Sequence, residues 1–163
     1  MSNLLTSDVL EALRPTKAGL TLIITVGNVL RGDDGIGPYI ATQVSNPKRG
    51  LRILDAADRP EDCLDAAASL HPAKTVVIDA ADFGGEPGEA RIVPQELIPE
   101  TTISTHTFPL KIITRMIEEE TGSTVFFLGI QPQDMNFGQG LSDPVRNTAD
   151  AIVRVLKGRP RHA

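Results

Sequence analysis

Cysteine is almost missing from this sequence: Cys63 is the only one in 163 residues. A single cysteine excludes an internal disulfide and a zinc site built from several thiolates. No histidine or asparagine pattern of a thiol protease surrounds Cys63, and its segment is predicted to be a packed helix. We therefore expect an inert thiol.

Long apolar runs and an excess of basic residues are also missing. No apolar run approaches the roughly 20 residues of a membrane-spanning helix. The first residues do not form a signal peptide, because Asp8 and Glu11 interrupt their apolar stretch. The net charge of -5 argues against nucleic acid or an anionic membrane as partner. These absences predict a cytoplasmic protein that binds neither nucleic acid nor membrane.

Three common hydrolase motifs are absent from the sequence. It has no H-E-x-x-H of zinc proteases, no G-x-S-x-G of serine hydrolases and no Asp-Thr/Ser-Gly of pepsin-like proteases. Any catalysis must therefore depend on another arrangement of side chains.

Short apolar segments alternate with segments of helical periodicity, which predicts an α/β fold. The expected strands are residues 21–26, 51–55, 75–78, 89–93 and 125–129. The expected helices are residues 3–13, 37–44, 60–70, 107–120 and 142–157. Too few residues separate the third and fourth strands for a helical crossover, so we expect 89–93 to run antiparallel. Residues 1–163 are predicted to form one three-layer α/β/α domain, with 1–19 as an extra N-terminal segment and 159–163 as a tail.

The most informative stretch is residues 21–38, which read TLIITVGNVLRGDDGIGP. A strand, a glycine-bearing turn and a helix start in this order build a ligand site at the carboxyl end of the strand. Gly27 and Gly32 have the spacing of a phosphate-binding loop, but Asp33 and Asp34 stand where Lys and Ser/Thr would be. Because two carboxylates repel phosphate, the loop is more suited to a metal ion.

Two further polar residues are expected near this acidic pair. Asp79 ends the third strand, and His106 lies in a polar stretch that opens a helix. Carboxylates and an imidazole suit Ni²⁺, Zn²⁺ or Mn²⁺. A helix N-terminus disfavours the imidazolium form and so helps to keep His106 able to bind metal. Three protein ligands would leave open positions, as catalytic sites do.

Each of these residues also has a purely structural interpretation. Asp33 is expected to be the N-cap of the following helix, where its replacement by Ala would cost about 0.5–2 kcal/mol. Asp79 could organise a turn, and His106 could be a cap or a surface residue. For Asp55, at the end of the second strand, and for Asp82 we expect a structural role. One helix needs only one cap, so the doubled aspartate leaves one carboxylate available for another role.

Four motifs now indicate a family. The motifs VGNVLRGDDGIGP, VVIDAADFG with PGEARIV after it, THTFPL and FFLGIQP occur in this order, within a resemblance that covers roughly residues 22–156. The sequence closely resembles the nickel–iron hydrogenase maturation endopeptidases, above all the type that processes the large subunit of the formate-hydrogenlyase hydrogenase (hydrogenase 3). This resemblance implies a five-stranded mixed, mostly parallel sheet with one antiparallel strand.

The resemblance also implies an activity and a site. The activity is removal of a C-terminal extension from the nickel-loaded precursor of the hydrogenase large subunit. The implied nickel ligands, and thus the catalytic centre, are Asp34, Asp79 and His106, and thiolates of the precursor could complete the nickel shell. Some relatives have Glu at the position of Asp34. Residues 1–19 are not explained by the family pattern.

Several alternatives remain open at this point. Either the metal polarises the scissile carbonyl or an aspartate activates water. Residues 129–132 and the loop to Gly140 are candidates for gripping the substrate. A non-catalytic nickel-dependent chaperone of the precursor is one alternative function. A receiver-like phosphoacceptor domain is another, although Gln131 and Pro132 stand where its lysine would be expected.

Overall fold

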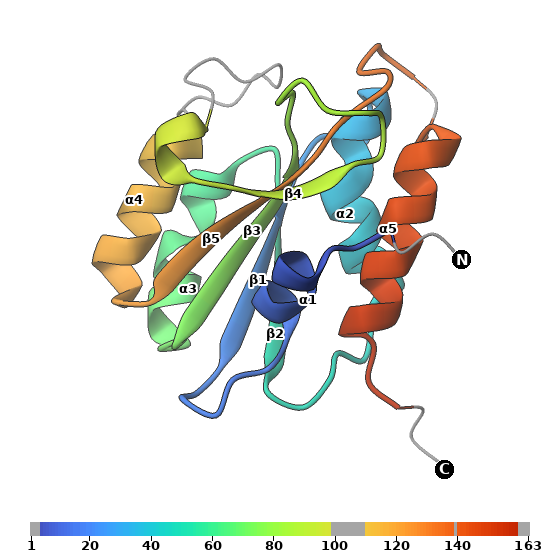
Figure 1. The fold of residues 1–163 in the computed structure, drawn as a ribbon. Coiled ribbons are helices and arrows are strands. Elements are labelled where there is room, and N and C mark those ends of the chain that lie inside the picture. Colours follow the sequence, from blue (N-terminus) through green and yellow to red (C-terminus); the bar gives the residue numbers. More distant parts are fainter. Residues whose placement is uncertain (1–3, 99–109, 139, 160–163) are drawn as a thin grey trace.

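The chain folds around one five-stranded sheet, seen in a computed structural model that describes residues 4–98, 110–138 and 140–159 (Figure 1). The strands are β1 (Thr21–Val26), β2 (Leu51–Ala57), β3 (Lys74–Ala80), β4 (Ala90–Val93) and β5 (Thr124–Ile130). Their spatial order is β2-β1-β3-β5-β4. The pairs β1–β2, β1–β3 and β3–β5 are parallel, and β4 pairs with β5 antiparallel. The predicted mixed, mostly parallel sheet is confirmed.

Helices cover both faces of the sheet, which gives the predicted three layers (Figure 1). The helices are α1 (Ser7–Leu13), α2 (Ile36–Gln43), α3 (Leu64–Ser69), α4 (Leu110–Thr121) and α5 (Asp143–Leu156), with short 3₁₀ helices η1 (Gly32–Gly35), η2 (Pro60–Cys63) and η3 (Gln95–Leu97). One core cluster joins the sheet to α1, α2 and α5, and the other joins it to α3 and α4. Within the described ranges, no helix has the length and apolar character needed to span a bilayer.

The central strands β1 and β3 are buried on both faces, which explains why their sequences are so uniformly apolar. Every residue of β1 is buried, as is every residue of β3 after Lys74. The first strand was predicted with its observed bounds, and the other four differ from prediction by at most two residues at either end. A continuous apolar run predicts such a strand well, because a central strand packs against hydrophobic helix surfaces on both faces of the sheet.

The helices differ more from the sequence prediction. The helix after β1 begins at Ile36, directly after η1, and it buries Ile36 and Ile40 while Ala41 is only partly buried. The helix predicted from residue 60 starts as the 3₁₀ turn η2 and continues as α3. Residues 107–109 lie outside the described residues, so the predicted start of the fourth helix is not tested. That helix continues to Thr121, and Gly122 follows with a φ of 70°.

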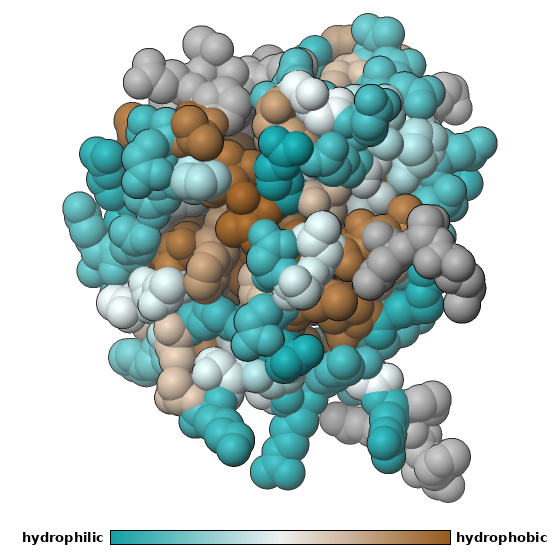
Figure 2. All heavy atoms as spheres, in the orientation of Figure 1, coloured by the Kyte–Doolittle hydropathy of each residue, from teal (hydrophilic) through white to brown (hydrophobic). Residues whose placement is uncertain are grey.

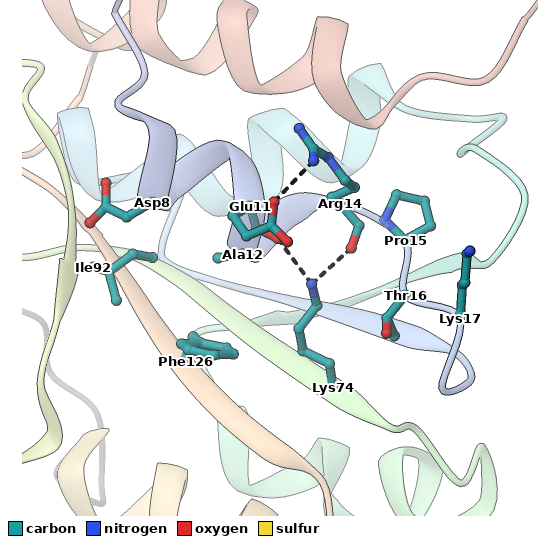
Figure 3. Close-up of a pocket in the computed structure, with 10 residues that line it drawn as sticks. All are labelled: Asp8, Glu11, Ala12, Arg14, Pro15, Thr16, Lys17, Lys74, Ile92 and Phe126. Carbon is teal, nitrogen blue, oxygen red and sulfur yellow. Dashed lines mark hydrogen bonds and ion pairs between the residues drawn. The ribbon is translucent and has the colours of Figure 1, made fainter.

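The N-terminal segment is part of the core. Val9 and Leu13 of α1 are fully buried in the cluster that includes α5. The end of α1 is fixed to the sheet by Lys74, whose Nζ donates hydrogen bonds to the carbonyl oxygens of Glu11 (3.1 Å) and Arg14 (2.8 Å), as Figure 3 shows. A cation at this position interacts favourably with the carbonyl end of the helix. The segment that the family pattern does not explain is therefore structural.

A groove of about 660 Å³ lies beside α1. Its apolar surface includes Ile92 and Phe126 of β4 and β5, and Figure 3 shows charged side chains of α1 and Lys74 around it. In Figure 2 hydrophobic residues reach the surface between α1 and α4. The helix that borders this groove, α1, is seven residues long.

Candidate active site

Two of the predicted site residues lie at the carboxyl edge of the sheet. Asp34 is in η1, shortly after β1, and Asp79 is the last but one residue of β3. Because β1 and β3 are adjacent and parallel, their carboxyl ends lie side by side, and η1 contacts β3. Both aspartates have no exposed surface. The fold thus buries two carboxyl groups at the edge where open α/β proteins bind their ligands.

Backbone N–H groups orient both carboxylates. Asn28 N donates to Asp34 Oδ2 at 3.0 Å, and Ala80 N donates to Asp79 Oδ1 at 2.8 Å. Burying a carboxylate is costly unless donors or a cation compensate for the lost water. Two buried carboxylates at neighbouring strand ends are accordingly a donor set suited to a divalent cation with hard or borderline preferences.

Two glycines let η1, the acidic turn that carries Asp33 and Asp34, approach β1 closely. Gly27 has a φ of 149°, and a Cβ on it would lie 1.9 Å from the carbonyl oxygen of Asp34. A Cβ on Gly37 would lie 2.2 Å from the carbonyl oxygen of Val26. The glycines of the first motif therefore serve tight packing of strand, turn and helix, as glycines do in other strand–turn–helix ligand sites.

The expectation that Asp33 is an N-cap is wrong. The N-cap of α2 is Gly35, and no side chain caps that helix. Asp33 is fully buried and accepts four hydrogen bonds from the segment after β5. The donors are Gln133 N (2.8 Å), Asp134 N (2.9 Å), Ser142 N (2.7 Å) and Ser142 Oγ (2.8 Å). The first acid of the pair thus anchors a distant loop, while the second accepts a hydrogen bond from Asn28 N of its own loop.

Gln131, one of the residues that the sequence offers as candidates for gripping the substrate, has a structural role. Its side chain is nearly buried, and Oε1 accepts hydrogen bonds from Phe83 N (2.9 Å) and Gly85 N (3.0 Å). Its Nε2 donates to Asp82 at 3.0 Å, and this hydrogen bond lowers the pKa of the Asp82 carboxyl group. Gln131 therefore orders the loop after β3. Sequence reasoning missed this role, because the partners lie nearly fifty positions away.

The structural roles expected for Asp55 and Asp82 are confirmed. Asp55 accepts hydrogen bonds from Thr25 Oγ1 (3.1 Å) and Ala57 N (3.0 Å) at the edge of the sheet. Asp82 accepts from Gly84 N at 3.0 Å as well as from Gln131. Both acids therefore organise turns.

The third predicted ligand, His106, lies outside the described residues. Within residues 4–98, 110–138 and 140–159, no group of three or more His, Cys, Asp or Glu side chains could hold a metal ion. The assignment of Asp34, Asp79 and His106 as one metal site therefore stays a prediction. The described residues supply two members of that set.

Cys63 is predicted to be unreactive and dispensable. Its side chain is half-buried at the end of η2, and burial raises the pKa of the thiol, with the nearby carboxylates of Asp55 and Asp62 adding to the effect. Because only the thiolate reacts, iodoacetamide should modify the folded protein at neutral pH more slowly than it modifies free cysteine. Cys63→Ala should process substrate at the wild-type rate. Inactivation of the wild type by alkylation, with Cys63→Ala protected, would contradict this prediction.

The fold and these acids define a class: an open, mostly parallel α/β protein with buried carboxylates at the carboxyl edge of its sheet. Residues 39–158 match the protein family described as hydrogenase maturation protease. The chain belongs to the hydrogenase maturation protease family.

Individual relatives agree with this assignment. The chain is 32% identical over 139 residues to the hydrogenase 3 maturation protease of Escherichia coli K12, covering 84% of this chain and 88% of that protein. It is 28% identical over 144 residues to a putative hydrogenase maturation protease of Methanocaldococcus jannaschii, covering 83% and 85%. The structure matches the crystal structure of a [NiFe] hydrogenase maturation protease from Thermococcus kodakarensis KOD1 with a TM-score of 0.77 at 28% identity, covering 91% of this chain and 96% of that one.

Proposed function

We infer that this protein is an endopeptidase that processes the precursor of a hydrogenase large subunit. The observation that carries this conclusion is its membership of the hydrogenase maturation protease family, supported over most of the chain by sequence and by fold. The receiver-like alternative does not fit the fold. Receiver domains of the CheY type have the strand order 2-1-3-4-5, whereas here β4 is an antiparallel edge strand beyond β5.

The finer proposal concerns the substrate. We propose that the enzyme removes a C-terminal extension from the precursor after nickel has been inserted, and that this happens in the cytoplasm. Nickel held by the precursor would then distinguish loaded from empty substrate. The resemblance of the four sequence motifs to the nickel–iron hydrogenase endopeptidases supports this proposal.

We also propose that Asp34, Asp79 and His106 bind the nickel. The burial of both aspartates at adjacent strand ends supports the proposal, because ionised carboxyl groups there gain from a cation. When bound, the metal would supply Lewis-acid polarisation. Asn28 N and Ala80 N each hold one oxygen of these carboxylates by a hydrogen bond, which restricts the rotation of both groups.

The decisive experiment measures the mass of the precursor. Purified nickel-loaded precursor incubated with this protein should be shortened at its C-terminal end, as seen by mass spectrometry. Precursor without nickel, incubated in parallel, should keep its full mass. A loaded precursor that binds the protein and stays intact would instead support the chaperone alternative.

A further inference from the structure

Two loops are joined beside the acidic turn. The loop after β1 and the loop after β5 exchange backbone hydrogen bonds from Gly138 N to Leu30 O (2.9 Å), Gly32 N to Gly138 O (3.3 Å) and Asp33 N to Asp134 O (2.8 Å). The contact needs a glycine: Gly32 has a φ of 54°, and a Cβ on it would lie 2.5 Å from the carbonyl oxygen of Asp134. Backbone hydrogen bonds therefore join the two loops into a single surface.

This surface exposes large apolar side chains. Val29, Leu30 and Phe137 are 60%, 62% and 78% exposed, and they are three of the six exposed large apolar residues found in the described part of the chain. We call these three side chains the apolar ledge. The guanidinium carbon of Arg31 lies 5.0 Å from the ring centroid of Phe137, a cation–π distance that restrains the exposed ring. Clustered exposed apolar side chains commonly mark a binding surface.

A small cavity opens beside the ledge. It measures about 220 Å³, and its lining includes Val29, Gly35, Pro38, Tyr39, Leu141 and Arg146. Whole small-molecule ligands usually occupy about 300–1,000 Å³, so a cavity of this size suits a single side chain. Its walls come from the acidic turn, α2 and the start of α5, which places it next to the candidate active site.

We propose that the apolar ledge and this cavity bind the precursor segment beside the cleaved bond, with an apolar side chain of that segment in the cavity. This inference rests on the proposed function. Leu30 is only four positions before Asp34, and the loop between them is bonded to the segment that Asp33 anchors. The ledge and the turn that carries Asp34 therefore belong to one hydrogen-bonded pair of loops, along which the residues beside the cleaved bond can extend.

The test separates docking from chemistry. Leu30→Ser and Phe137→Ser should fold normally, since both side chains are mostly exposed. Each should raise the KM for nickel-loaded precursor roughly 10-fold by removing apolar burial, with little change in kcat. Ile112→Ser is the matched control, because Ile112 is an exposed aliphatic residue on α4, which packs on the other face of the sheet. It should leave KM unchanged.

Binding of uncleaved precursor, measured by calorimetry, gives a second readout. If the wild type binds but does not shorten the precursor, the proposed function fails, while weaker binding by Leu30→Ser and Phe137→Ser would still support the docking surface. If both variants keep KM and precursor affinity within twofold of wild type, the docking surface is wrong. An equal loss in Ile112→Ser would likewise overturn it, since the effect would not be confined to the ledge.

Discussion

Asp34→Asn and Asp79→Asn should each process the precursor at least about 100-fold more slowly than the wild type. Asparagine keeps the shape of the side chain and one acceptor oxygen, but it removes the negative charge that would hold a cation. Even residues that only orient metal ligands contribute about 10–100-fold to affinity or activity. Loss of a metal ligand itself should lower the processing rate by a larger factor. The measurement is the initial rate of precursor shortening.

Asp55→Asn is the matched control, because Asp55 lies at the same edge of the sheet and organises a turn. It should stay within a few-fold of the wild-type rate. Calorimetry with nickel alone should show weaker binding in Asp34→Asn and Asp79→Asn than in Asp55→Asn. Wild-type processing by either site variant would remove that residue from the proposed metal site.

Asp33→Ala should lower the free energy of unfolding by about 3 kcal/mol or more. The substitution removes the acceptor of four hydrogen bonds, three of them from backbone N–H groups. Each buried donor left unsatisfied costs about 1–3 kcal/mol. This loss exceeds the 0.5–2 kcal/mol expected for an N-cap. Processing should also fall, because the turn that carries Asp34 loses its side-chain hydrogen bonds to the segment after β5 and keeps only the backbone ones.

The free energy of unfolding of Asp33→Ala, measured by chemical denaturation, is compared with that of Asp65→Ala. Asp65 is an exposed acid in the first turn of α3, so its replacement should change stability by no more than about 0.5 kcal/mol. A loss below 1 kcal/mol in Asp33→Ala would show that water replaces the four hydrogen bonds and that Asp33 does not anchor the loop.

The sequence predicts the sheet well because the relevant signals are local. The apolar runs of β1 and β3 and the short connection before β4 each lie within a few residues, and all three predictions are confirmed. The position of Asp79 at the end of β3 and of Asp34 in the turn after β1 follows from the same local pattern. Open α/β topology then places the two acids at one edge.

The roles of Asp33 and Gln131 could not be predicted in this way. An aspartate just before a helix has the same local sequence whether it caps that helix or accepts bonds from elsewhere. The donors to Asp33 are about 100 residues away in the chain, and no periodic pattern connects them. The hydrogen bonds of Gln131 likewise cross nearly fifty positions. Such pairings appear only once the tertiary structure is known.

The docking of α1 on α5 has a consequence for synthesis. The ribosome makes Val9 and Leu13 early, but the residues of α5 that complete their core emerge about 140 positions later. Until then the apolar side of the first helix has no complete partner, and such exposed surface promotes aggregation. Contacts this far apart in sequence also slow folding. The core around α1 should therefore be completed only after α5 has been synthesised.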